Sequence, residues 1–213
     1  MNILQDTTRL ALMMCEKYID EESDAVDCTC GRGNDTLFLA RKCRRVYSFD
    51  IQEEALVSAQ QLMSANGISW RVWNHKQQSA QSGSEEKVIF IKDNHAYLER
   101  YINVQPALVI FNLGYLPGGD KRITTVAENT VKAVKAAVDV IKVGGLVCVT
   151  IYPGHEEGRK EFEAIKTFAQ NLEKNKFHCV MTDMLNQSSA APQILWITKN
   201  KNNNRRLPGI VFL

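Results

Sequence analysis

The chain has 213 residues, 45% of them hydrophobic and 23% charged, and its formal net charge is +2. This composition can build a full hydrophobic core, and the length predicts a single domain over residues 1–213. No apolar run approaches the ~20 residues that cross a bilayer, and the first residues lack the layout of a signal peptide, so we expect a cytoplasmic protein without a membrane partner. A net charge this small does not by itself indicate that the protein binds nucleic acid.

The six cysteines are spread through apolar segments rather than spaced as a disulfide framework, which predicts reduced, buried thiols. Cys28 and Cys30 are close enough to suggest a metal pair, but no matching Cys or His pair follows them. We therefore expect no metal site. The cysteines are Cys15, Cys28, Cys30, Cys43, Cys148 and Cys179.

The first half of the chain alternates between helical and strand patterns. Apolar residues at helical spacing predict helices, and short continuous apolar runs predict buried strands. The expected elements are a helix at Thr8–Ile19, a strand at Ala25–Thr29, a helix starting at Thr36–Ala40, a strand at Arg45–Phe49 and a helix at Gln52–Ala65. The polar stretch beyond Trp70 predicts a mobile insertion at about 74–87.

The second half continues this alternation until its last two strands, which follow each other directly. The expected elements are strands at Val88–Ile91 and Ala107–Phe111, a helix at about 125–142, a strand at Leu146–Ile151, a helix at Phe162–Leu172 and strands at Phe177–Met184 and Ile194–Thr198. The last two strands have no helix between them, so they should pair antiparallel. A polar, basic loop is expected at about 200–209. The pattern predicts a Rossmann-like α/β fold: a seven-stranded, mostly parallel sheet that ends in an antiparallel hairpin, with helices on both faces.

A glycine turn follows the first strand. Asp27 is followed by Gly31 and Gly33, whose missing side chains allow a tight turn and a close approach to a ligand, and Asp50 ends the next strand 23 residues after Asp27. A dinucleotide fingerprint would have glycines in place of Thr29 and Thr36, which weakens an NAD interpretation. An acid followed by x-x-x-G-x-G is typical of class I S-adenosylmethionine-dependent methyltransferases, and a plain turn with a helix cap is the alternative.

Acidic and polar residues at the ends of the predicted strands are the candidate cofactor ligands, because parallel sheets bind ligands beyond the carboxyl ends of their strands. We expect Asp50 to accept hydrogen bonds from the ribose hydroxyls, or else to be a strand-end turn residue. Asp93 would lie near the adenine, where Asn94 or His95 could replace it, and Asp27 near the methionine amino end. The full expected set is Asp27, Thr29, Gly31, Gly33, Asn34, Asp35, Asp50, Ile51, Asp93, Asn94, His95 and Asn112.

The segment Asn112-Leu113-Gly114-Tyr115 follows the fourth predicted strand of the parallel series. Methyltransferases that act on amino groups carry the related Asn/Asp-Pro-Pro-Tyr/Phe at this place. An Asn side chain can accept a hydrogen bond from an amino group, and an aromatic ring can stack on a base. Both prolines are replaced here, so a structural turn with Tyr115 packed inside is the alternative.

Four segments together resemble one family more closely. They are Asp27–Thr36, Phe111–Lys121, Tyr152–Gly158 and Asn186-Gln187, and they are similar to the bacterial rRNA methylase family of class I methyltransferases. The resemblance covers nearly the whole chain. It departs at Cys28 and Cys30, in the stretch from Trp70 to Lys87 and in the Asn/Lys/Arg-rich end.

The resemblance implies that S-adenosyl-L-methionine is the cofactor and that the substrate is the aminomethyl group on the wobble uridine of tRNA, in the anticodon stem-loop. It also suggests a homodimer. Asn112 and Tyr115 would orient the amine, and His155, alone or with Glu156, would take or relay its proton; a helix-cap histidine is the alternative for His155. An rRNA or small-molecule amine methyltransferase, and a non-catalytic RNA-binding module, are the alternative functions.

Basic residues are bunched in three places, at Arg41–Arg45, at Lys121-Arg122 and from Lys199 to Arg206. Each cluster taken alone is most simply a solvated surface. Steering of RNA phosphates requires that the clusters share a face.

Overall fold

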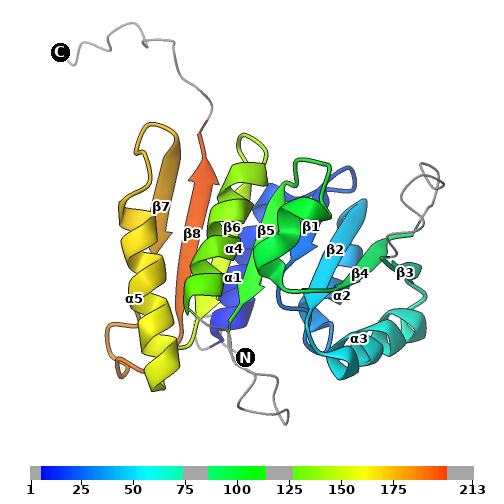
Figure 1. The fold of residues 1–213 in the computed structure, drawn as a ribbon, viewed down its shortest axis with the longest axis horizontal. Coiled ribbons are helices and arrows are strands. Elements are labelled where there is room, and N and C mark those ends of the chain that lie inside the picture. Colours follow the sequence, from blue (N-terminus) through cyan, green and yellow to red (C-terminus); the bar gives the residue numbers. More distant parts are fainter. Residues whose placement is uncertain (1–5, 74–85, 114–126, 201–213) are drawn as a thin grey trace, which may run out of the picture.

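The structure is a computed structural model that describes residues 6–73, 86–113 and 127–200 (Figure 1). The helices are α1 (Thr7–Cys15), α2 (Asn34–Ala40), α3 (Glu53–Ala65), α4 (Ala127–Val140) and α5 (Glu156–Gln170), with short 3₁₀ helices η2 (Glu16–Tyr18) and η4 (His95–Arg100). The strands are β1 (Asp24–Asp27), β2 (Arg45–Asp50), β3 (Trp70–Val72), β4 (Val88–Lys92), β5 (Leu108–Asn112), β6 (Leu146–Ile151), β7 (Phe177–Met181) and β8 (Gln193–Lys199).

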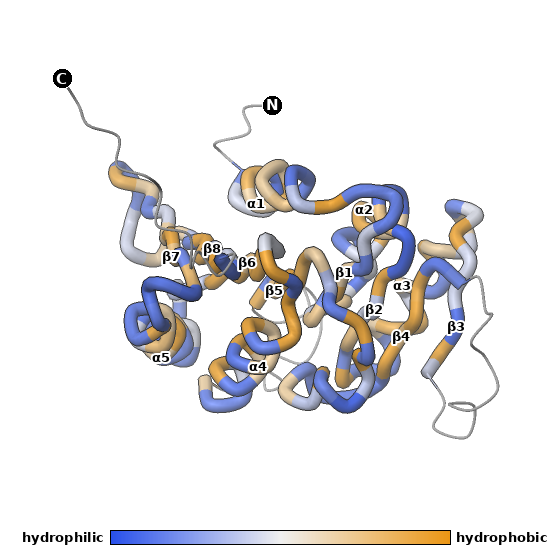
Figure 2. The backbone as a smooth tube through the Cα atoms, turned by 90° about the horizontal axis from the view of Figure 1, so that it is seen from above, coloured by the Kyte–Doolittle hydropathy of each residue, from blue (hydrophilic) through white to orange (hydrophobic). Residues whose placement is uncertain are grey.

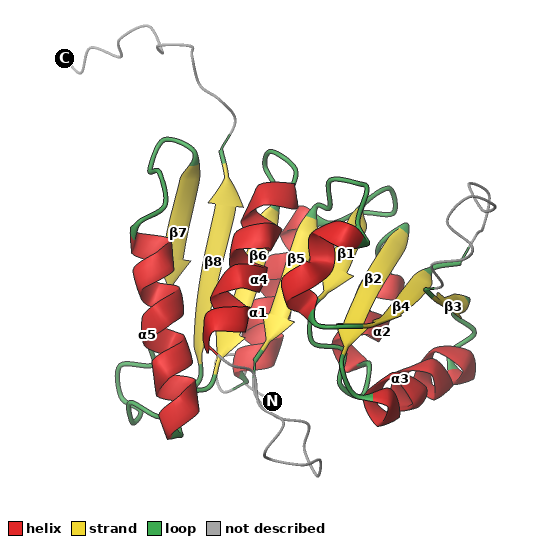
Figure 3. Ribbon diagram, in the orientation of Figure 1, coloured by secondary structure: helices red, strands yellow, loops and turns green. Residues whose placement is uncertain are grey.

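All the described strands form one sheet in the order β3-β4-β2-β1-β5-β6-β8-β7. Neighbours pair parallel from β3 to β6, whereas β8 pairs antiparallel with both β6 and β7, so its arrow points against its neighbours (Figure 3). The predicted α/β class, mostly parallel sheet and closing hairpin are confirmed. The sheet has eight strands rather than seven because the three residues of β3 add a short edge strand beside β4.

Helices cover both faces of the sheet (Figure 2). One apolar core lies between the sheet and α1, α2 and α3, where Leu39, Leu56 and Met63 are fully buried. The other core lies between the sheet and η4, α4 and α5, and it includes Val134 and Ile165. The central strands β1 and β5 are buried on both faces, as their continuous runs of apolar residues predict.

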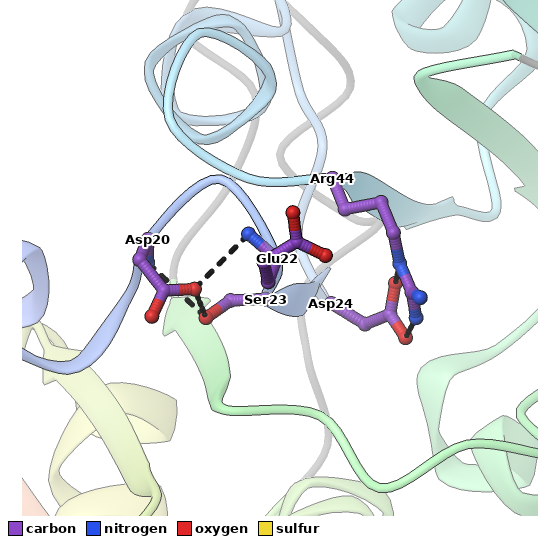
Figure 4. A network of polar contacts seen from close by, with 5 residues as sticks. All are labelled: Asp20, Glu22, Ser23, Asp24 and Arg44. Atoms are coloured by element: carbon purple, nitrogen blue, oxygen red, sulfur yellow. Dashed lines mark hydrogen bonds and ion pairs between the residues drawn. The ribbon is translucent and has the colours of Figure 1, made fainter.

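The edge of the sheet where the parallel strands begin is closed by polar contacts (Figure 4). Asp20 Oδ1 accepts hydrogen bonds from Ser23 Oγ at 2.6 Å and from the Glu22 N–H at 3.1 Å, which builds the turn into β1. Asp24 then binds Arg44 through both carboxylate oxygens, at 3.2 and 2.5 Å. This edge lies opposite the carboxyl ends of the strands, where the candidate ligands are.

Two predicted segments fall largely outside the described residues. Of the insertion expected at about 74–87, residues 74–85 lie outside, whereas Lys87 is bound to the body of the domain: its N–H donates to Ser69 Oγ at 3.1 Å and its Nζ to the Cys43 carbonyl at 2.9 Å. Of the loop expected at about 200–209, the part after Asn200 lies outside.

The cysteines are free, as expected, and five of the six are buried. The expectation of burial is wrong for Cys179, because β7 is an edge strand whose central residues are exposed. None of the helices in the described part of the chain is long and apolar enough to cross a membrane.

Candidate active site

The chain order of the strands reverses between β1 and β5, which is the point at which open α/β sheets bind ligands, outside the carboxyl ends of the strands. The two strand ends are tied together there. The Cys28 N–H donates to the Ile110 carbonyl at 2.9 Å, and the Asn112 N–H donates to Thr29 Oγ1 at 2.7 Å. These bonds place Thr29 and Asn112, two of the predicted site residues, side by side.

The glycine turn after β1 has the backbone that its sequence predicts. Gly31 and Gly33 adopt positive φ values of 50° and 84°, a region that side-chain-bearing residues rarely enter. A Cβ on Gly33 would lie 2.7 Å from Cβ and 2.9 Å from Cα of Ala59 in α3. Gly33 is therefore required by close packing of the turn against α3, and its expected contact with a ligand stays a prediction.

Asp27 supports this turn from inside the protein. Its side chain is fully buried; Oδ1 accepts from the Thr29 N–H at 3.0 Å and Oδ2 from Thr36 Oγ1 at 2.6 Å. Burial, and next the charge of Asp35, raise the pKa of Asp27 to about 7. Asp27 therefore holds the Thr29 amide and the Thr36 hydroxyl in place, and its expected position near the methionine amino end stays a prediction.

Asp50 ends β2 and faces the same turn. Its Oδ2 accepts from the Gly31 N–H and its Oδ1 from the Gln52 N–H, each at 2.9 Å. Each oxygen keeps a second lone pair for another donor, such as a sugar hydroxyl. Beside it, Ile51 is 50% exposed and offers an apolar surface at the strand end.

The segment after β4 is held by its own side chains. Asp93 accepts hydrogen bonds from the Tyr101 hydroxyl and, at 2.7 Å, from the Asn94 N–H. Asn94 Oδ1 accepts from the Ala96 N–H at 2.9 Å and so caps η4. Tyr101 packs edge-on against Phe49. The carboxylate of Asp93 thereby has a fixed orientation at the end of β4.

His95 connects this segment to β1. Its Nδ1 lies 2.7 Å from the Cys28 carbonyl oxygen, and its ring packs edge-on against Phe111. Burial lowers the pKa of His95, which favours a neutral ring that donates its Nδ1–H to that carbonyl. This arrangement gives His95 a role in positioning strand ends.

Asn112 is the centre of a polar cluster at the end of β5. Its Nδ2 donates to Asp35 Oδ2 at 3.3 Å, and its Oδ1 accepts from the Tyr152 hydroxyl at 2.9 Å, so the two contacts fix the orientation of the amide. Burial raises the pKa of Asp35 and of Tyr152. A small pocket between α1 and the sheet reaches this cluster, and Thr8 and Thr150 are among its lining residues.

Tyr152 and Tyr101 were not among the predicted site residues. Tyr152 is the first residue after β6, so the rule that strand ends face the site could have found it. Tyr101 carries no such signal, because only the fold of η4 brings its hydroxyl back to Asp93.

The remaining predicted residues differ in position. Asn34, the first residue of α2, is exposed. His155 caps α5, and its Nδ1 accepts from the Gly158 N–H at 3.1 Å, which is the helix-cap alternative that the sequence left open. Tyr115 lies outside the described residues.

The site fits S-adenosylmethionine on three observations. Asp50 has acceptor capacity for ribose hydroxyls, and Ile51 beside it offers an exposed apolar surface for an adenine ring. Asp27 and Asp35 are carboxyl groups whose pKa values are raised by burial, and the donors that reach them are neutral. A ligand that carries a sulfonium and an ammonium would offset the cost of those buried charges.

The sheet order, the glycine turn and the row of strand-end carboxylates define a class I S-adenosylmethionine-dependent methyltransferase. Comparison with known proteins agrees: the family described as "Putative rRNA methylase" matches residues 46–198. The chain belongs to this family.

A curated relative, "tRNA (mnm(5)s(2)U34)-methyltransferase, chloroplastic" from Arabidopsis thaliana, is 32% identical over 205 residues, which are 92% of this chain and 70% of that protein. Among solved structures, a protein from Clostridium thermocellum described as a "putative rRNA-methylase" is 32% identical with a TM-score of 0.80, covering 93% of this chain and 98% of that one. A protein from Streptococcus mutans described as "a putative methyltransferase", solved in complex with SAH, is 28% identical with a TM-score of 0.77, covering 90% of this chain and 97% of that one.

Proposed function

We propose that this enzyme methylates the aminomethyl nitrogen on the wobble uridine of tRNA, converting 5-aminomethyl-2-thiouridine into 5-methylaminomethyl-2-thiouridine. The observation that carries the chemical part of the proposal is the oriented amide of Asn112 at the topological switch point. The name of the Arabidopsis relative supports the choice of substrate.

The cluster around Asn112 suits a nitrogen nucleophile. Amines need hydrogen-bond acceptors, and the side-chain oxygens of Asn112 and Asp35 lie in one cluster at the end of β5. The Tyr152 hydroxyl completes the arrangement, because its donation to Asn112 Oδ1 keeps that oxygen from rotating away. In this proposal Asn112 positions the amine, Asp35 holds the Asn112 amide, and the ring of Tyr115 contacts the base.

The rate of this reaction depends more on the positioning of the amine and the methyl group than on a strong base. The cofactor supplies an electrophilic methyl group on a positively charged sulfur. Repulsion between that charge and a substrate ammonium about 4 Å away amounts to roughly 4 kcal/mol at an effective dielectric near 20, which lowers the ammonium pKa by about three units. The proton can then leave to a weak acceptor, and His155 is free to remain a helix cap.

The purified protein with S-adenosylmethionine tests the proposal. The substrate is tRNA from cells whose wobble uridines stop at the aminomethyl stage, and the readout is mass spectrometry of the nucleosides. We expect one methyl group on the aminomethyl nitrogen and a rate at least 100-fold lower for Asn112→Ala, the scale on which loss of positioning acts.

Parallel reactions with rRNA and with a small primary amine separate the alternatives. Methylation of either one, with the tRNA nucleoside unchanged, would replace this substrate assignment. No transfer to any acceptor, together with no heat on titration with S-adenosylmethionine, would point to a non-catalytic RNA-binding module. The homodimer suggested by the sequence stays a prediction, which sedimentation of the protein alone can test.

A further inference from the structure

The basic cluster nearest the glycine turn in sequence is not placed to hold RNA at the site. Lys42 pairs with Glu16 at 2.6 Å and Arg44 with Asp24 at 2.5 Å, and both pairs lie at the edge where the parallel strands begin. Lys199 is likewise engaged, because its Nζ donates to carbonyl oxygens at the end of α4, the nearest at 2.9 Å. Positive charge that faces RNA at the opposite edge has to come from other residues.

Two exposed cations, one on η4 and one on α4, each lie close to the aromatic ring of Tyr97 on η4. The guanidinium carbon of Arg100 lies 4.2 Å from the ring centroid of Tyr97, and Nζ of Lys132 lies 4.4 Å from the same centroid. Residues 95–100 form the green coil beside α4 in Figure 1. Tyr97, Arg100 and Lys132 are not consecutive in the sequence, so this group cannot be recognised as a basic cluster from the sequence alone.

Among the residues that the structure describes, neither Arg100 nor Lys132 is in an ion pair, although Glu99 and Glu128 are close in sequence. A cation–π contact holds a cation in place through the quadrupole of the ring and leaves its full charge. Two positive charges close to one ring make this part of the surface locally positive, which favours anionic groups there.

This group borders the methyl-transfer site. The helix η4 begins at His95, which is bonded to the end of β1, and is followed by Tyr101, whose hydroxyl donates to Asp93. A regular 3₁₀ helix rises about 2 Å per residue, and η4 is kinked at Tyr97, so its six residues span at most about 10 Å. A bound nucleotide at Asn112 would have neighbouring phosphates within such a distance.

We propose that Arg100 and Lys132, held over the ring of Tyr97, form a contact site for the phosphate backbone of the RNA substrate. This inference rests on the proposed RNA substrate and names the surface that holds it. The site takes phosphodiester groups without reading sequence, because point charges on phosphates position a nucleic acid and do not distinguish its bases.

The test compares two double variants of the full chain. Arg100→Gln with Lys132→Gln removes both charges but keeps long polar side chains at exposed positions. Lys42→Gln with Lys176→Gln is the matched control, since Lys42 and Lys176 are surface lysines paired with glutamates at the opposite edge. Binding of unfractionated tRNA is measured by fluorescence anisotropy at several salt concentrations, and binding of S-adenosylmethionine by calorimetry.

For the Arg100/Lys132 variant we expect tRNA binding about 10-fold weaker at low salt and a salt slope shallower by about 1 to 2, with cofactor affinity unchanged. The control variant should match the wild type. Tyr97→Phe should also match it, because the ring and not the hydroxyl contacts the cations. Wild-type affinity and slope in the Arg100/Lys132 variant, or an equal loss in the control, would overturn the proposal, as would a wild-type protein that does not bind tRNA.

The two proposals can fail separately. A wild-type protein that shows this charge dependence but leaves aminomethyl-thiouridine unmethylated would refute the substrate and keep the surface. If the protein methylates the nucleoside but the Arg100/Lys132 variant has the same KM for tRNA as the wild type, the substrate proposal stands and the phosphate contact site is refuted.

Discussion

The Asn112 N–H donates to Thr29 Oγ1 at 2.7 Å, and this bond joins residues 83 positions apart in the sequence at the switch point of the sheet. It couples the glycine turn to the residue that we propose positions the substrate amine. Thr29→Val keeps the shape but leaves that N–H without its partner, so we expect a loss of about 1–3 kcal/mol in the free energy of unfolding by urea. Thr29→Ser, which keeps the hydroxyl, should be close to wild type; equal losses in both variants would contradict a role for the hydrogen bond.

Asp50 should carry much of the cofactor affinity. Hydrogen bonds from ribose hydroxyls to a carboxylate contribute about 1.5–3 kcal/mol each, so Asp50→Asn should weaken S-adenosylmethionine binding by about 10- to 100-fold. Calorimetry measures this directly. Asn has a single side-chain oxygen, so it can accept from only one of the Gly31 and Gln52 amides, and we also expect some loss of thermal stability without cofactor. A folded variant with wild-type affinity would remove Asp50 from the site.

The pKa of Asp27, raised to about 7 by burial, makes stability depend on pH. An unfolded Asp titrates near 3.9, so the folded state holds this proton over a range where the unfolded state has lost it. The stabilisation from the protonated form is complete below the unfolded pKa and is lost as pH rises through 7. Relative to Asp27→Asn, the wild type should lose roughly 2–3 kcal/mol between pH 5 and 7.5, measured by urea unfolding at each pH. A difference that does not change with pH would contradict the raised pKa.

His155 should matter for stability more than for chemistry. Its Nδ1 accepts the Gly158 N–H, so His155→Ala should cost about 1 kcal/mol, as for other N-cap residues. Asn is a good N-cap, and His155→Asn should restore both stability and methylation. If His155→Asn instead folds normally but methylates at least 100-fold more slowly, the histidine is the proton acceptor that the family resemblance suggested.

The sequence predicted the order of elements well because the buried strands and amphipathic helices are long and strongly patterned. It missed β3, whose three residues form a strand only through pairing with β4. The predicted helix at Phe162–Leu172 starts earlier in the structure, at Glu156, since its first turn is polar and is defined by the His155 cap rather than by apolar spacing.

The candidate site shows the same limit. Strand-end acids such as Asp50 could be predicted, because parallel strands bring their carboxyl ends to one edge. The burial of Asp27, the contact of Gly33 with Ala59 and the pairing of Tyr101 with Asp93 could not, since each depends on how distant elements pack. The contacts of Arg100 and Lys132 with the ring of Tyr97 likewise join η4 to α4, and no local sequence pattern predicts them.

The central claim is that this enzyme methylates a wobble-uridine amine on tRNA. Mass spectrometry of wobble nucleosides from cells that lack the protein tests it most directly. We predict that 5-aminomethyl-2-thiouridine accumulates, that its methylated product disappears, and that the wild-type protein but not Asn112→Ala reverses both changes. Unchanged amounts of the two nucleosides in the deleted cells would contradict the claim.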